Sequence, residues 1–591
     1  MISSHGTVAR RWSWTLLTGL LLALFAVTVR SDAVVAGERE TTFRMAALSL
    51  AWDGDLTYGR ADYDRYVRLF GAEPEAIALE TSTGGVRIGF ARPPAYAVLA
   101  APFVRVLPRR GPALLNWLLL VVAAAGSALV LERRVGSWAP VWIAVFVAGT
   151  TAFTLVPLSS PGMFRLATSA LAWALVLHVM PVADGERRPQ GRRPLRGEAL
   201  RWSLVGFLLI LATVASVDGL SLLPALGAAA WLALLQPRRG IALLSLTVAA
   251  VLTAGVSFGT SALARGGAGP VERAVFNPST GFPAVDFEPA EWRPEAEAAA
   301  RAAPAGRGPD LRAAAGTRPE TLHHATTGRT IGIVPYCVPL VWAALWGLFA
   351  TGWRRVFLLG ALASVAARVV FFPFDLGDES ALVGPGGIGA VLPVFWFLAG
   401  RLGPARLAAV AASSALFLYP LWLRPGAAYG PQPLPEGALH RFLPAETGQR
   451  PRAGEPADLF AGDVWLRPVA GRVTPFGESG ILIEGGSAEF LVAWEPDAPG
   501  SLEVGREVRR SRLRILLEQE DTVLEVVGGE VEESRPLSSG RTSVRLLLDP
   551  PVARHRMWWS SGPVDLFRLG LTLDGGEDPT SHRVLGIGSV P

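Results

Sequence analysis

Residues 113–131 read ALLNWLLLVVAAAGSALVL and are followed at once by Glu132-Arg133-Arg134. An α-helix of this length can cross the hydrocarbon core of a bilayer, which is roughly 30 Å thick. No residue of the run is charged, and arginines directly after such a run are typical of a helix that ends at a membrane surface. The stretch therefore predicts a membrane-spanning helix, and the same pattern recurs along the chain.

The composition also indicates a membrane protein. Of the 591 residues 50% are hydrophobic but only 18% are charged, whereas soluble domains carry about a quarter charged residues. All 55 basic residues are arginines, which is typical of a GC-rich bacterial genome. Because they form short clusters between apolar runs, we interpret them as orientation signals and expect no nucleic-acid partner. Cys337 is the only cysteine, which excludes a disulfide framework.

Apolar runs predict about eleven spanning helices, of which the first follows Arg10-Arg11 and is better explained as an uncleaved helix than as a signal peptide. The predicted fold class is thus a polytopic α-helical membrane protein with about 11 to 13 transmembrane helices. The runs are 12–29, 113–131, 139–156, 164–179, 202–217, 220–235, 241–262, 333–352, 356–372, 388–399 and 407–423.

The arginine clusters orient these helices. They alternate without contradiction if the N-terminus is cytoplasmic and the C-terminus lies outside the cytoplasmic membrane. The run 93–107 is then too short to cross and forms a re-entrant or partial helix; if it does cross, a hairpin near Asp218 and Gly219 fails to cross instead. Asp218 is either a functional charge inside the apolar phase or part of a short turn. The clusters are Arg133/Arg134, residues 187–201, Arg238/Arg239, Arg354/Arg355 and Arg401/Arg406.

Three domains or segments follow from this topology. Residues 1–424 form the membrane domain, with outer loops at 30–92 and 264–330, and residues 425–456 form a linker rich in proline and glycine. Residues 457–591 contain short alternating strands separated by Gly, Pro and Asp turns. Strands at this spacing predict an extracytoplasmic β-sandwich.

The first outer loop is rich in acids, among them Glu38, Glu40, Asp53 and Asp55. Acids held where an outer loop meets a bilayer can act as a general base toward a hydroxyl, or can coordinate a divalent cation. Exposed loops also carry acids simply because they are solvated, and spacing alone does not decide between these interpretations.

Several stretches resemble the GT-C superfamily of polyprenyl-phosphate-dependent glycosyltransferases, which includes bacterial relatives of protein mannosyltransferases and of the aminoarabinose transferase. In the first outer loop, Ala47-Leu48-Ser49-Leu50 runs into Asp53-Gly54-Asp55-Leu56 and is later followed by Arg92-Pro93-Pro94-Ala95-Tyr96. Residues 328–336, GRTIGIVPY, and the glycine-rich residues 384–389, GPGGIG, resemble segments that open late helices in bacterial members. The β-rich region is not part of the shared core.

The resemblance implies an inverting glycosyltransferase with a polyprenyl-phosphate sugar as donor and a hydroxyl of a glycan, lipid or protein as acceptor. An acid just after the first helix would receive the acceptor proton, and Glu40, Glu38, Asp53 and Asp55 are the candidates. Arg329 or Arg92 would neutralise the lipid phosphate. The sequence departs from the family in two places, because Arg39-Glu40 stands where an Asp or Asp-Glu is usual and residues 390–392 replace an Asn-Arg-Tyr element.

These departures leave a second hypothesis open. The chain could be a catalytically degenerate membrane scaffold that presents the β-sandwich for binding at the cell envelope. A transporter or flippase of lipid-linked sugars is a third hypothesis, which the long outer loops argue against.

Overall fold

The structure is a computed structural model that describes much of the membrane region and the strands of the C-terminal region. The described residues are 4–30, 37–74, 77–82, 87–180, 195–215, 217–264, 267, 271–276, 325–328, 332–371, 384–400, 402–423, 439, 443, 459–461, 464–476, 480–494, 512–517, 522–527, 534–535, 542–549, 565–573 and 582–589.

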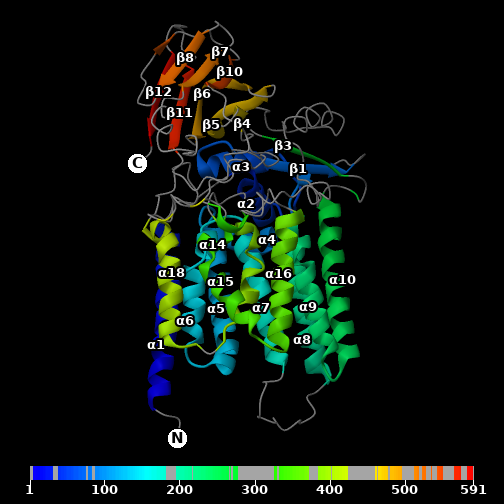
Figure 1. The fold of residues 1–591 in the computed structure, drawn as a ribbon. Coiled ribbons are helices and arrows are strands. Elements are labelled where there is room, and N and C mark those ends of the chain that lie inside the picture. Colours follow the sequence, from blue (N-terminus) through cyan, green and yellow to red (C-terminus); the bar gives the residue numbers. More distant parts are fainter. Residues whose placement is uncertain are drawn as a thin grey trace.

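A bundle of apolar helices forms most of the described chain (Figure 1). Five of these helices are long and apolar enough to cross a membrane, namely those over 7–29, 111–135, 197–214, 239–264 and 404–423. The protein is therefore a mostly helical membrane protein. The helices of the bundle are α1 (Ser4–Arg30), α5 (Gly111–Val135), α6 (Ala139–Ala148), α7 (Gly162–Val179), α8 (Leu195–Val214), α9 (Leu223–Leu234), α10 (Arg239–Ala264), α15 (Val338–Leu348), α16 (Trp353–Phe371), α17 (Leu392–Trp396) and α18 (Pro404–Leu423).

Three of the predicted runs are interrupted rather than continuous. The run 139–156 ends its α-helix at Ala148 and continues as the 3₁₀ helix η1 (Thr151–Leu155). The run 333–352 divides at Cys337 into α14 (Ile333–Tyr336) and α15, and 388–399 gives only η4 (Gly386–Ile388) and α17. Two breaks touch, because the backbones of Thr150 and Cys337 pair as an isolated antiparallel bridge. Apolar composition alone did not reveal these interruptions.

Several predicted cytoplasmic arginine clusters lie at one end of the bundle, which we call the arginine end. Arg10 of α1 forms an ion pair of 2.7 Å with Glu132 of α5. The guanidinium of Arg134 lies 5.9 Å from the centre of the Trp353 ring, at the start of α16. Arg238 lies 3.6 Å from the carboxylate in the first turn of α8. Helix ends distant in sequence therefore meet here.

The two outer loops meet at the opposite end, which we call the loop end (Figure 1). Here α2 (Gly37–Trp52) packs against a three-stranded antiparallel sheet in the order β2-β1-β3, and α3 (Arg60–Phe70) packs against α2. Strands β1 (Ile77–Ser82) and β2 (Gly89–Phe90) come from the first loop and β3 (Val271–Phe276) from the second. The pairing of β1 with β3 places residues 77–82 of the first predicted loop beside residues 271–276 of the second.

Helix α4 (Pro94–Val106) corresponds to the short run 93–107. Just before it, the Ala91 amide donates to the carbonyl of Ala78 in β1 (3.0 Å). At its end, the Arg105 guanidinium donates to the Ala51 carbonyl of α2 (2.8 Å), and Arg109 donates to the Leu69 carbonyl of α3 (2.7 Å). Both ends of α4 thus contact elements of the loop end.

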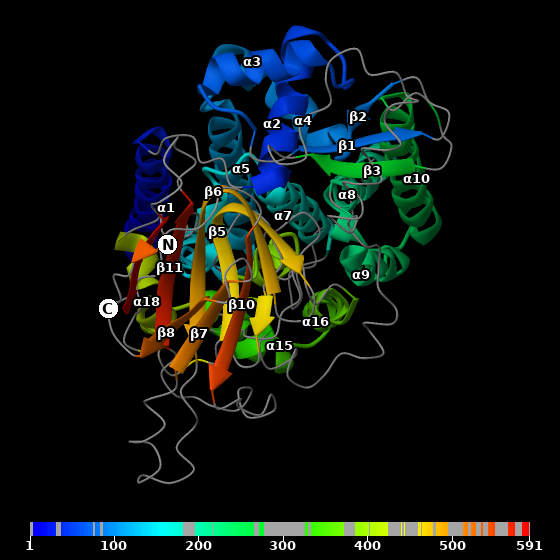
Figure 2. The same cartoon turned by 90° about the horizontal axis from the view of Figure 1, so that it is seen from above.

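The C-terminal strands pair into one antiparallel network in the order β8-β7-β10-β6-β11-β12-β9, with β5 also on β6 and β4 on β5. Strand β6 pairs with β10 through residues 480–483 and with β11 through 487–494. In Figure 1 these strands lie above the helical bundle, on the side of the loop end, and Figure 2 shows them from above. The β-sandwich remains a prediction. The strands are β4 (Leu459–Ala461), β5 (Val464–Phe476), β6 (Gly480–Trp494), β7 (Arg512–Leu517), β8 (Thr522–Val527), β9 (Ser534–Arg535), β10 (Thr542–Asp549), β11 (Asp565–Leu573) and β12 (His582–Ser589).

A glycine at the turn between α8 and α9 has a steric reason to be there. Gly219 lies in the 3₁₀ helix η2 (Val217–Leu222), and a Cβ added to it would lie 1.6 Å from the carbonyl oxygen of Thr213. Gly219 therefore allows the backbone of this turn to lie directly against the backbone of Thr213.

We predict that Gly219→Ala lowers the melting temperature of the detergent-purified protein, because overpacking against backbone typically costs about 1–3 kcal/mol. Gly227→Ala on α9 is the matched control, since its added Cβ has nothing within 4 Å. Equal melting temperatures for the Gly219 variant and the wild type would show that the α8–α9 turn relaxes freely.

Candidate functional site

The four candidate acids of the first outer loop belong to two groups at opposite ends of α2. Glu40 lies in the first turn of the helix, and Asp53 and Asp55 follow its last residue, Trp52. At about 1.5 Å per residue, Glu40 and Asp53 are about 20 Å apart along the helix. They cannot act on the same reacting atom, and each group has to be considered separately.

The first group of acids lies in a cluster of buried side chains at the start of α2. We call it the Glu40 cluster, and it consists of Glu40, Arg44, Tyr96, Asn116 and Ser159. Its members come from α2, α4, α5 and the segment before α7. Glu40 is 0% exposed and Arg44 is 1% exposed. Because isolated charges are very costly to bury, an acid and an arginine buried one helical turn apart indicate an arrangement in which each charge offsets the other.

The side chain of Arg44 is held by a residue from outside its own helix, α2. Its Nε and Nη2 atoms donate to the hydroxyl oxygen of Ser159 at 3.1 and 2.7 Å. The guanidinium also lies 4.9 Å from the centre of the Phe70 ring. Burial lowers the pKa of Arg44, and the negative charge of Glu40 acts in the opposite direction. The arginine is thus a fixed positive charge in a site from which water is largely excluded.

Tyr96 and Asn116 complete the cluster. The Tyr96 hydroxyl donates to Oδ1 of Asn116 at 3.3 Å, and both side chains are buried. Burial raises the pKa of Tyr96, and the negative charge of Glu40 raises it further. The Tyr96 hydroxyl therefore stays protonated, and Glu40 acts electrostatically on both the tyrosine and Arg44.

Such an arrangement can combine two chemical tasks. A carboxylate in a site from which water is excluded can act as a general base toward a hydroxyl within hydrogen-bond reach. A fixed guanidinium can stabilise negative charge that develops on a leaving phosphate. The Glu40 cluster holds both groups at the end of the bundle where the outer loops lie.

The other residues that the sequence singled out are not members of the Glu40 cluster. Arg39 directly precedes Glu40, and neighbouring residues on a helix point in different directions. Arg92 is half-buried, and two hydrogen bonds connect its neighbourhood to α2: from the Ala91 amide to the Ala78 carbonyl, and from the Ala78 amide to the Thr42 hydroxyl (2.9 Å). The side chain of Glu38 and the whole of Arg329 lie outside the described residues.

Two further buried arginines were missed by the reasoning from sequence. Arg165 lies in the first turn of α7, where its Nε donates to the Ala212 carbonyl at 3.1 Å, and Arg368 lies in the last turn of α16. They are 4% and 2% exposed. Both lie within predicted apolar runs. A charged residue inside such a run is expected to have a function, and this was the signal in the sequence that could have identified them. Residues 390–392, in contrast, are core residues.

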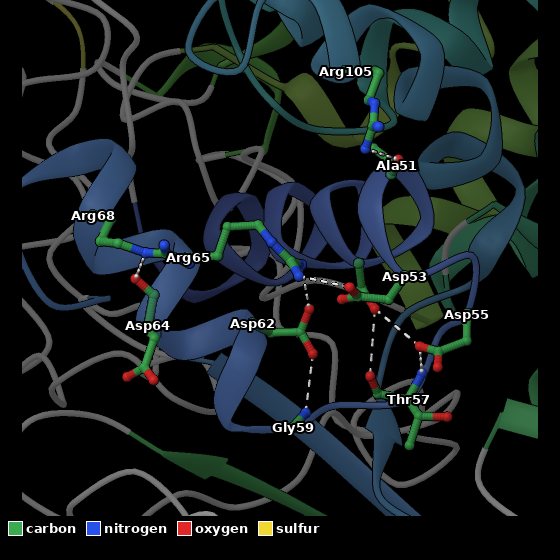
Figure 3. A network of polar contacts seen from close by, with 11 residues as sticks. Ala51, Asp53, Asp55, Thr57, Gly59, Asp62, Asp64, Arg65, Arg68 and Arg105 are labelled. Carbon is green, nitrogen blue, oxygen red and sulfur yellow. Dashed lines mark hydrogen bonds and ion pairs between the residues drawn. The ribbon is translucent and has the colours of Figure 1, made fainter.

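The second group is a polar network at the C-terminal end of α2 (Figure 3). Arg65 of α3 pairs with Asp53 at 2.7 Å and with Asp62 at 3.0 Å. Asp55 Oδ1 accepts from the Thr57 amide (3.1 Å), which shapes the turn that follows α2. Asp53 thus connects the end of α2 to α3, and Asp55 accepts a hydrogen bond within the turn between the two helices.

Asp62 has an unusual titration within this network. Burial raises the pKa of Asp62 to about 7, against the opposing effects of the hydrogen bond from the Gly59 amide and of the Arg65 charge; the charges of Asp53 and Asp55 raise it slightly more. The folded state therefore binds the Asp62 proton more tightly than the unfolded chain does.

The metal option for these acids finds no support in the described part of the chain. Among those residues no group of three or more His, Cys, Asp or Glu side chains is placed to hold a metal ion.

The Asp62 titration predicts how stability depends on pH. Because the pKa of Asp62 is higher in the folded state than in the unfolded chain, protonated Asp62 stabilises the folded state. This stabilisation is fully present below about pH 4 and is lost as the pH rises through about 7. Melting temperatures between pH 4.5 and 7.5 should therefore fall more steeply in the wild type than in Asp62→Asn. Asp64→Asn, on the exposed face of α3, should keep the wild-type slope, and an identical slope in all three proteins would contradict the assignment.

Comparison with known proteins gives structural similarities only. No protein-family model and no curated protein sequence matches the chain. The structure is similar to that of ArnT from Cupriavidus metallidurans bound to undecaprenyl phosphate, with a TM-score of 0.42 and 12% identity over 74% of this chain and 68% of that chain. It is also similar to the archaeal oligosaccharyltransferase AglB from Archaeoglobus fulgidus in complex with an inhibitory peptide and a dolichol-phosphate, with a TM-score of 0.35 and 10% identity over 71% of this chain and 56% of that chain. At these TM-scores the function of this chain has to be argued from its own residues.

Proposed function

We propose that the chain is an inverting glycosyltransferase that transfers a sugar from a polyprenyl-phosphate carrier to an acceptor hydroxyl. In this proposal the arginine end of the bundle faces the cytoplasm, and the loop end faces the outer side of a bacterial cytoplasmic membrane. The reaction then takes place where the outer loops meet the bilayer, within reach of a lipid whose phosphate lies at the membrane surface.

The observation that carries the proposal is the burial of Glu40 and Arg44 one helical turn apart on α2, at the loop end, where the charge of Glu40 acts on Arg44. A fold that needs only to span a membrane has no reason to bury two opposite charges, because replacing such a pair with apolar residues is often neutral or stabilising. Glu40 is also the acid at the position that the family resemblance assigns to the acceptor base. The two lines of reasoning, from burial and from sequence position, meet on the same residue.

The roles follow from the chemistry of each group. The acceptor oxygen attacks the anomeric carbon of the sugar and loses its proton to Glu40. The bond between that carbon and the phosphate oxygen breaks, and its electron pair stays on the lipid phosphate. Arg44 offsets the charge of the departing phosphate, with Arg92 as a second cation from the adjoining loop. Arg329 and Glu38 remain candidates from the resemblance alone.

The alternative of a degenerate scaffold is not favoured by these contacts. Such a scaffold would be expected to lose its catalytic charges, since a buried acid and arginine destabilise a fold that does not use them. Here the charges are retained, and Ser159 supplies hydrogen bonds that fix the arginine.

The test compares acids from the two ends of α2. Removal of a positioned general base typically costs about a hundredfold to ten-thousandfold in rate, so Glu40→Gln should abolish transfer from a radiolabelled polyprenyl-phosphate sugar in membranes. Asp53→Asn and Asp55→Asn should stay within about threefold of the wild type, because those side chains are about 20 Å away.

Membrane insertion and protein amount are measured for every variant. Activity of Glu40→Gln close to that of the wild type would show that the base lies elsewhere. Absence of transfer by the wild type with all polyprenyl-phosphate sugars tried would count against the function itself.

A further inference from the structure

Asn116 is a buried amide in the middle of an apolar helix, and it contacts both halves of the Glu40 cluster. We propose that Asn116 is the positioning residue of the site, which holds Arg44 and Tyr96 in register with Glu40. The inference rests on the proposed function and adds a residue that reaches neither the sugar nor the phosphate itself.

The first contact of Asn116 is with the irregular chain between η1 and α7. Its Nδ2 donates to the carbonyl oxygens of Leu155 (3.4 Å), Val156 (3.3 Å) and, at a shorter distance, Leu158. Backbone carbonyls outside a helix need donors when they are buried in an apolar bundle. One side-chain amide thus fastens residues 155–158 to α5.

The same contacts also determine the position of Arg44. Ser159 directly follows Leu158, and its hydroxyl accepts both bonds from the Arg44 guanidinium. Displacement of residues 155–158 therefore displaces the anchor of Arg44. Arg44 is long and flexible, and without that anchor its charge would no longer be held at one distance from Glu40.

The second contact is with the tyrosine. Oδ1 of Asn116 accepts from the Tyr96 hydroxyl at 3.3 Å, which directs the hydroxyl proton away from other partners. The Tyr96 ring is held edge-on against Phe43 of α2, with ring centres 5.6 Å apart, and the charge of Glu40 acts on its hydroxyl. Asn116 thus uses its donor on one side of the cluster and its acceptor on the other.

Positioning of this kind has a kinetic signature. Misplacement of catalytic groups by about 1 Å can cost about a hundredfold in rate. Asn116→Ala should therefore lower kcat by about tenfold to a hundredfold while the KM for the polyprenyl-phosphate sugar stays within about threefold. Ser127→Ala is the matched control, because Ser127 is buried on the same helix about three turns farther toward the arginine end.

Asn116→Asp separates positioning from general destabilisation. A neutral aspartic acid keeps the acceptor for Tyr96 and can donate one bond to the carbonyls, whereas its ionised form repels all three. The ratio of Asn116→Asp to wild-type kcat should therefore fall as the pH rises, and the ratio for Asn116→Ala, which has no titratable group there, should stay flat. Tyr96→Phe combined with Asn116→Ala should lower kcat less than the product of the two single effects, because both remove the same hydrogen bond.

The outcomes distinguish the two proposals. If the wild type and Ser127→Ala transfer sugar and Asn116→Ala transfers it equally well, the positioning role is wrong and the proposed function stands. The role is also wrong if Asn116→Ala acts through KM alone, or if Asn116→Asp and Asn116→Ala show the same pH dependence. If the wild type transfers no sugar, the proposed function and the positioning role fail together.

Discussion

The burial of a carboxylate and a guanidinium at the loop end of an apolar bundle is the constraint on which the rest of the site depends. Each of these ions loses several kcal/mol of hydration when it leaves water. The surrounding elements therefore have to supply an opposite charge and hydrogen bonds. Glu40 and Arg44 supply the charges to each other from one face of α2, and Ser159 supplies the hydrogen bonds from the chain before α7. The site thus needs elements from α2, α4, α5 and the α6–α7 connection together.

That need explains why the bundle is irregular near this end. A continuous α-helix satisfies its own backbone groups and has no carbonyls to offer, whereas broken helices do. The interruption between α6 and α7 provides the carbonyls of residues 155–158 and the Ser159 hydroxyl. It is stabilised by close contacts with other breaks: Thr150 pairs with Cys337, and a Cβ added to Gly384 would lie 2.4 Å from the Thr151 hydroxyl. The irregular segments support one another, and their polar groups become available to the site.

The apolar runs made the long helices predictable, and those over 12–29, 113–131 and 241–262 lie within helices of the structure. The breaks at residues 149–150 and 337 were not predicted, although Gly149 and Thr150 at the first break and Pro335 and Pro339 beside the second are signals of a helix end. The contacts between distant segments that fix these breaks cannot be read from the local sequence. Glu40 was proposed from its place after the first helix. Arg44 was missed because an arginine in an outer loop is normally solvated, and nothing local shows that Ser159 covers it. The 20 Å between Glu40 and Asp53 follows from the helical rise once residues 37–52 are known to form one helix.

The central claim is that the phosphate of a polyprenyl carrier binds beside Arg44, and labelling with a photoreactive polyprenyl phosphate tests it most directly. The reactive group should be placed next to the phosphate, and the labelled peptides of the full-length membrane protein should be identified by mass spectrometry. The account predicts labels in residues 37–52 or 155–165, competition by unlabelled polyprenyl phosphate, and loss of these labels in Arg44→Gln. Labels confined to other segments, or undiminished labelling of these segments in Arg44→Gln, would contradict it.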